Sequence, residues 1–207
     1  MNLHLRGTVL AALSILLGAC SILPKAEAPN VYLLPAAAAS AGVGAGAPTA
    51  RFESLRVDTP QAGRALDGSG IAVVPAGNVI TVYQGARWSD RAPRLLRDRL
   101  LDAFRADGRY PALSSDDTQL QAELELAGDL RAFQTEYVGG QPVVVIRYDA
   151  QLVQPRSRRI LASRRFEIRQ PVDGKAVPQV VLAFGQAADQ LSAQLVDWVS
   201  AARSGGR

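Results

Sequence analysis

A short apolar run near the start of the chain ends at its only cysteine, Cys20, and this feature constrains the fold most. Residues 1–6 carry one firm positive charge, Arg6, and residues 8–17 are apolar except for two hydroxyl side chains. A run of this length suits the hydrophobic region of a secretory signal and is too short to span a bilayer. We therefore expect the folded part of the protein to follow Cys20.

The residues at the end of this run are Leu17-Gly18-Ala19-Cys20, which resemble the lipobox of bacterial lipoproteins. The resemblance implies that a diacylglyceryl group alkylates the thiol, that the chain is cut before Cys20, and that the new amine is acylated. Two or more acyl chains give stable attachment at roughly 0.8 kcal/mol per buried methylene. Ser21 stands where an aspartate favours inner-membrane retention, which implies passage to the outer membrane. The alternative is a buried core cysteine after an N-terminal helix.

The chain beyond Cys20 has few groups suited to catalysis, because the only histidine is His4. The mature chain would hold no imidazole and no free thiol, which excludes Cys/His nucleophiles, Ser-His-Asp triads and zinc sites built on His or Cys. We expect no catalytic residue, no metal and no cofactor other than covalent acyl groups on Cys20. The net charge of +4 is too small and too dispersed to indicate nucleic-acid binding.

The pattern of composition divides the chain into three parts. Residues 1–19 are the expected signal peptide. Residues 20–50 are a lipidated tether, which holds a short strand at 31–34 and an Ala/Gly-rich flexible linker at 36–50. Residues 51–203 are the expected folded domain.

Within that domain, runs of β-branched and alternating apolar residues predict a series of strands. They fall at residues 54–57, 71–74, 79–83, 120–126 with a continuation to 133, 143–153 and 160–168. Gly128 suggests one bulge and Arg164, which breaks the apolar parity of its strand, suggests another. Glu123 and Glu125 are two residues apart, so they should share a face that points to water rather than form a catalytic pair.

Two amphipathic stretches predict helices. The first begins near Ser89 or Asp90, either of which could cap it, and ends at Gly108, with its arginines, Arg97 among them, on the solvated faces. The second runs over residues 177–202. The predicted fold class is α/β: a single-domain sandwich with a mixed, mostly antiparallel sheet and two main helices.

Two features could contact a partner or lipid. Trp88, just before the first helix, is either a core residue at the strand–helix corner or a contact for lipid or partner. Arg156, Arg158 and Arg159 form a basic turn between two strands. That turn is either a solvated hairpin tip or a contact for lipid headgroups or an acidic partner.

Several motifs together resemble one family over nearly the whole mature chain. They are Tyr32-Leu33-Leu34, Trp88-Ser89-Asp90-Arg91-Ala92-Pro93 running into Leu95-Leu96, Leu100-Leu101 and Phe104, then Leu124, Leu126, Leu130 and Phe133, and finally Phe166 and the stretch from Ala183-Phe184 to Trp198. The family is that of the ABC-type transport auxiliary lipoproteins, the PqiC/YmbA-like proteins.

This resemblance implies a periplasmic accessory of MCE-type systems, which move phospholipids or other hydrophobic molecules between the inner and outer membranes. The implied partners are an MCE-domain protein, the ABC transporter or permease of the same system and the outer-membrane lipid surface, with a ring-like homo-oligomer as a further implication. Two alternatives stay open. One is an assembly adaptor for another envelope complex, and the other is a periplasmic hydrolase that uses carboxylates.

Overall fold

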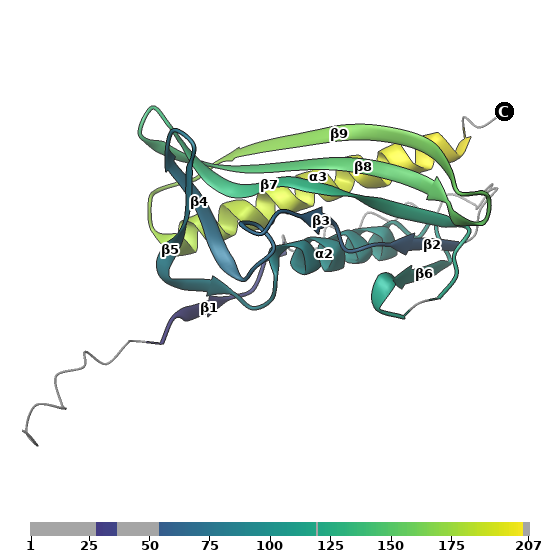
Figure 1. Ribbon diagram of the computed structural model, residues 1–207, viewed down its shortest axis with the longest axis horizontal. Helices are drawn as coiled ribbons and strands as arrows, with labels where there is room; N and C mark the ends of the chain where they lie inside the picture. Colours follow the sequence, from purple (N-terminus) through teal and green to yellow (C-terminus); the bar gives the residue numbers. More distant parts are fainter. Residues whose placement is uncertain (1–27, 37–53, 119, 205–207) are drawn as a thin grey trace, which may run out of the picture.

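The computed structural model describes residues 28–36, 54–118 and 120–204, which form one sheet and two helices (Figure 1). The strands are β1 (Asn30–Tyr32), β2 (Ser54–Val57), β3 (Gln61–Ala62), β4 (Gly70–Ala76), β5 (Val79–Trp88), β6 (Ala112–Ser115), β7 (Leu124–Val138), β8 (Gln141–Gln154) and β9 (Arg159–Pro171). The helices are α2 (Ala92–Asp107) and α3 (Val177–Ser204), with short 3-10 turns η2 (Asp116–Thr118) and η3 (Pro155–Ser157). The predicted α/β fold class is confirmed.

Strand β7 organises the sheet. On one side it pairs with β8 along its whole length, and β8 pairs in turn with β9, so that three long antiparallel strands form a meander. On its other side β7 pairs in turn with β2, β3 and β4, and each of these strands runs parallel to it. The antiparallel hairpin partner of β4 is β5, and β1 adds to the edge of β5 in a parallel register. The sheet therefore mixes both kinds of pairing.

The two helices cover one face of the sheet, and the hydrophobic core lies between these two layers (Figure 1). Helix α3 packs on β8 and β9 and also contacts α2. Its apolar stripe, which includes Phe184, Leu191 and Leu195, is fully buried. Burial of such side chains stabilises the fold by about 1.5–3 kcal/mol each before entropy is subtracted. The stripe predicted from the sequence is therefore the core-facing side of α3.

The first helix begins at Ala92, which is three residues after Ser89 and two after Asp90, the two predicted cap residues. Its N-cap residue is Arg91, which makes no side-chain cap, and the Asp90 carboxylate accepts a hydrogen bond from the Arg91 backbone N–H at 2.7 Å. The N–H of Ala92 donates instead to the carbonyl of Gly68, at 3.1 Å. A loop thus supplies the acceptor that a capping side chain was expected to provide. The predicted end is confirmed, because Gly108 adopts φ 73° and its N–H returns to Phe104.

Both predicted bulges were wrong in position. Gly128 pairs in register with Ala150, and the irregularity lies between Leu130 and Ala132. Arg164 likewise pairs in register, with Ala150. The register shift in β9 lies between Ile160 and Ala162, which pair with Val153 and Leu152. Gly128 is explained by close approach instead. A Cβ there would lie 2.2 Å from the Asp149 carbonyl oxygen and 2.9 Å from the Tyr148 ring.

The prediction that Arg97 lies on a solvated face was also wrong. Its side chain is only 4% exposed and forms ion pairs with Asp98, Asp116 and Asp117 at 2.7 Å, 3.0 Å and 2.9 Å. Its Nη1 also donates to the Thr59 hydroxyl at 3.1 Å. A guanidinium can occupy a buried site when its donors are paired in this way. Arg97 therefore fixes η2 and the loop after β2 onto helix α2.

Candidate interaction surfaces

Trp88 belongs to the core, which is the first of the two roles considered for it. The residue is 1% exposed, and its ring meets Phe184 edge-on with centroids 5.2 Å apart, and Phe133 at 6.1 Å. Phe133 and Phe184 also contact each other at 4.8 Å. Edge-to-face contacts of this kind contribute about 0.5–1.5 kcal/mol beyond area burial. A ring packed so closely has no face left for lipid or partner, so the contact role for Trp88 is set aside.

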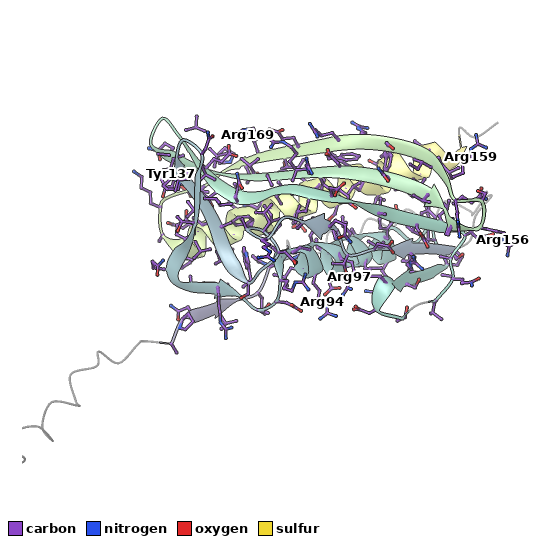
Figure 2. All side chains as sticks on the ribbon, viewed as in Figure 1. Arg94, Arg97, Tyr137, Arg156, Arg159 and Arg169 are labelled. Carbon is purple, nitrogen blue, oxygen red and sulfur yellow. The ribbon has the colours of Figure 1, made fainter. Side chains whose placement is uncertain are left out.

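The three arginines of the basic turn, by contrast, are exposed at one end of the molecule, beside η3 (Figure 2). Arg158 adopts φ 54°, and its backbone N–H donates to the carbonyl of Pro155 at 3.1 Å, which closes the turn. Among the described residues, Arg156, Arg158 and Arg159 form no ion pair within 4.0 Å, although most other arginines do. The turn therefore presents three positive charges without internal partners to compensate them.

A groove of about 410 Å³ lies at the base of this turn. Its lining comes from β2, the segment before β7 and the start of β7, the end of β8 and η3, and consists of Ser54, Arg56, Gln121, Ala122, Glu123, Glu125, Gln154, Pro155 and Arg156. Both predicted surface glutamates thus face the same space, although Glu125 is more buried than the sequence suggested, with 15% of its side chain exposed. Most of the lining residues are polar, and they include Arg156 of the arginine turn.

The charges on the groove floor compensate each other. Arg56 pairs with Glu125 at 2.5 Å and with Asp58 at 2.8 Å. The hydrogen bond to Asp58 raises the pKa of Arg56, whereas burial raises the pKa of Glu125 against the opposing effect of Arg56. Glu123 accepts a hydrogen bond from the Ser54 N–H at 3.4 Å. These glutamates are structural partners of Arg56 and Ser54, and this arrangement favours the solvated-face interpretation over an acid–base pair.

The opposite end of the molecule exposes several apolar side chains beside one ion pair, between Glu136 and Arg169 at 3.1 Å. It consists of the tips of the β4–β5 and β7–β8 hairpins, which lie side by side because β4 pairs with β7 over Glu136 and Val74 (Figure 1). Val79, Ile80, Val82 and Val138 are the large exposed apolar side chains here, with exposed fractions from 40% to 62%. A hollow of about 460 Å³ between the tips has a mixed lining of Val74, Ala76, Gly77, Asn78, Ile80, Gln134, Glu136 and Tyr137. We call these two tips the hairpin tips.

A clamp on the segment after β1 was not predicted from the sequence. Arg99 of α2 donates hydrogen bonds to the carbonyls of Leu34 and Pro35 and pairs with Asp189 of α3 at 3.3 Å. Gly185 of α3 leaves room for Pro35, since a Cβ there would lie 2.5 Å from the Pro35 carbonyl oxygen. The chain that follows β1 is therefore fixed across both helices. A glycine on the apolar stripe of α3 was the one available signal.

The predicted anchor residues Leu17, Gly18, Ala19 and Cys20 lie outside the described residues, as do the Ala/Gly-rich linker from residue 37 and the signal peptide. In the part of the chain that the structure describes, no helix is both long and apolar enough to cross a bilayer. Over those same residues, no group of three or more His, Cys, Asp or Glu side chains is placed to hold a metal ion.

Comparison with known proteins identifies the family. The sequence pattern described as the ABC-type transport auxiliary lipoprotein component matches residues 32–196. The chain belongs to this family. The match runs from β1 into the last turns of α3, so the auxiliary lipoprotein domain includes both the arginine turn and the hairpin tips.

Two solved structures support the assignment. The crystal structure of a protein from Xanthomonas campestris is 30% identical, and the match covers 84% of this chain and 94% of that one with a TM-score of 0.70. The crystal structure of an uncharacterized protein is 17% identical, covers 84% and 99% of the two chains with a TM-score of 0.63, and shows the same fold.

An uncharacterized protein of Bradyrhizobium diazoefficiens is 27% identical to the auxiliary lipoprotein over 146 residues. That match covers 70% of this chain and 39% of the relative, so the chain spans well under half the length of that protein.

Proposed function

We propose that this auxiliary lipoprotein is a periplasmic accessory of an MCE/ABC-type system that moves phospholipids or other hydrophobic molecules between the inner and outer membranes. Acyl groups on Cys20 hold it on the periplasmic face of the outer membrane. It performs no chemistry of its own and acts by docking an MCE-domain protein that is coupled to an ABC transporter or permease. The match to the family over residues 32–196 carries the proposal.

The charge distribution supports a docking role for the end of the molecule that bears the arginine turn. Arg156, Arg158 and Arg159 are exposed without ion pairs among the described residues, beside a groove whose own charges are compensated. Uncompensated charge on a protein surface steers an oppositely charged partner and fixes its orientation. The partner surface that this turn fits is acidic.

Affinity purification of the lipidated chain from envelope membranes tests the proposal. The wild-type chain should retain an MCE-domain protein, and cells without the gene should show raised outer-membrane permeability and surface-exposed phospholipid. The variant Arg156→Ser/Arg158→Asn/Arg159→Ser should lose most of the retained partner, with asparagine chosen because it tolerates the left-handed backbone at position 158. Replacement of Arg64 and Arg87, which are also exposed and without ion pairs among the described residues, is the matched control.

Retention of a different envelope complex, with normal permeability in the deletion strain, would favour the assembly-adaptor alternative instead. Retention unaffected by the triple variant would leave the accessory role in place and remove the arginine turn from it.

A further inference from the structure

We propose that the hairpin tips rest on the surface of the bilayer that holds the acyl anchor, with the valines and Ile80 inserted at the boundary between headgroups and acyl chains. The inference depends on the anchor at Cys20 that is part of the proposed function. It specifies which end of the domain contacts lipid, and therefore which end faces away from the bilayer.

The direction of the chain places the anchor on this side. Strand β1 runs parallel to β5, with Asn30 opposite Ala86 and Tyr32 opposite Trp88. The chain therefore enters β1 from the side on which lower-numbered residues of β5, and the hairpin tip at Val79, are found. Figure 1 shows β1 and both hairpin tips at the same end of the long axis.

The length of the tether limits how far away the bilayer can be. Seven residues, 21–27, separate Cys20 from Ala28, where the described structure begins. A fully extended chain spans at most about 3.3–3.6 Å per residue, so Cys20 lies within about 28 Å of Ala28. Val138 and Ile160 lie beside opposite ends of β8, opposite Gln141 and Val153, and are separated by about 40 Å at 3.3–3.4 Å per strand residue. The tether is thus shorter than the distance between the two ends, so an anchor that leaves from the β1 end reaches a bilayer at the hairpin tips and falls short of the arginine turn.

The composition of the tips fits a lipid surface. Residues 71–86 and 137–146, which include both tips, contain no charged side chain, and the ion pair of Glu136 with Arg169 lies beside them. Val138 follows two residues after Glu136, which pairs with Val74, and Ala76 pairs with Val79, so exposed valines of both hairpins lie at the same end of the sheet. Apolar side chains at the headgroup boundary bind in proportion to the area they bury, and the tip residues themselves bring no charge that must be desolvated.

The opposite end of the molecule has the contrary composition. Its turn carries three exposed arginines, whereas the ion pair of Arg165 with Asp149 lies midway along β9 and the ion pair of Arg169 with Glu136 lies beside the hairpin tips (Figure 2). Charged residues on an edge strand also prevent it from pairing with other strands. The two ends therefore differ in what they expose: the turn exposes positive charges, and the hairpin tips expose apolar side chains.

Depth-dependent quenching in vesicles tests the inference. With Cys20 consumed by lipid, a cysteine introduced at Val138 or Val79 is the sole free thiol and can carry a polarity-sensitive fluorophore. The matched controls lie at the other end. Ile160→Cys matches Val138→Cys, with exposed fractions of 54% and 55%, and Leu120→Cys matches Val79→Cys, with 59% and 62%. The lipidated full chain is reconstituted into phosphatidylethanolamine–phosphatidylglycerol vesicles that contain spin-labelled lipid.

We expect quenching by spin-labelled lipid to be at least about threefold stronger at Val138→Cys and Val79→Cys than at the two controls, with a blue shift only at the tips. Equal quenching at both ends, or stronger quenching at Ile160→Cys, would overturn the inference. So would energy transfer between copies at Val79→Cys without lipid quenching, because a second copy of the chain would then cover the tip.

Flotation of the vesicles before the measurement separates this inference from the proposed function. A chain that does not float lacks the acyl anchor, and the proposed attachment at Cys20 fails. The same four positions are then measured in a Cys20→Ser chain with a hexahistidine tag in place of residues 1–19, held on nickel-chelating lipid. This arm tests the contact of the tips with lipid whether or not the natural anchor exists.

Discussion

Replacement of Arg97 by methionine should destabilise the domain by about 2–3 kcal/mol. The guanidinium is 4% exposed and pairs with Asp98, Asp116 and Asp117 at 3.0 Å or less. Methionine keeps most of the apolar stem, so the change removes the charge and its hydrogen bonds while leaving little new cavity.

The magnitude follows from the exposure of the partners. Breaking a fully buried ion pair typically costs about 3–5 kcal/mol, because the remaining charge stays buried. Here the three carboxylates are 36% to 55% exposed, so water can solvate them once Arg97 is gone. The expected cost therefore falls below that range and reflects the lost charge-assisted hydrogen bonds, at about 1 kcal/mol each after solvation.

The effect should depend on pH through Asp116. Burial acts to raise the pKa of this carboxyl, but hydrogen bonds from the Thr59 backbone and from Arg97 outweigh it and hold the pKa below its ordinary value. Such a group stabilises the folded state above its unfolded pKa of about 3.9, and this contribution is lost as pH falls through the lower folded value. The cost of Arg97→Met should be largest near neutral pH and shrink as pH falls below the unfolded pKa of about 3.9.

Urea unfolding followed by circular dichroism, in the Cys20→Ser chain, measures both effects. Arg64→Met is the control, since Arg64 is exposed and without an ion pair in the part of the chain that the structure describes, and should change stability by less than about 0.5 kcal/mol. A cost for Arg97→Met as small as that of the control, or one that stays constant as pH falls from neutral to about pH 2, would contradict this prediction.

Three further substitutions test the packing. Gly128→Ala should cost several kcal/mol in urea unfolding, because the new Cβ would lie 2.2 Å from the Asp149 carbonyl oxygen; a neutral effect would show that β7 and β8 can separate there. Phe184→Ala should cost about 3–5 kcal/mol by the same assay, since it opens a cavity beside the other core aromatics. Gly185→Ala would ordinarily stabilise a helix by up to about 1 kcal/mol. Here it should displace Pro35 and speed proteolysis of residues 33–36, and unchanged cleavage would contradict the clamp.

Much of the fold could be predicted from periodicity. The strict alternation in residues 143–153 and the long apolar stripe of residues 177–202 each identify an element that has one face buried, and the structure confirms both as β8 and α3. Such patterns are read within one segment and do not depend on the rest of the chain. The bulges were misplaced because a register shift depends on how two strands pair, and the sequence of one strand alone does not determine that pairing.

The parts of the interaction surfaces that escaped prediction involve residues distant in sequence. Arg97 was placed among the solvated charges because its acidic partners, Asp116 and Asp117, lie in a segment with no pattern that places them beside the helix. The clamp on Pro35 likewise needs Arg99 and Gly185 from two helices. The arginine turn was visible in the sequence, but its position at the end opposite β1 follows only from the topology (Figure 2).

We propose that the domain works while held on a bilayer through Cys20. Intact-mass measurement of the protein purified from envelope membranes tests this most directly. We predict a chain that begins at Cys20 and carries a diacylglyceryl group on sulfur and an acyl group on its amine. A chain that keeps residues 1–19 and has an unmodified thiol at Cys20 would contradict the claim.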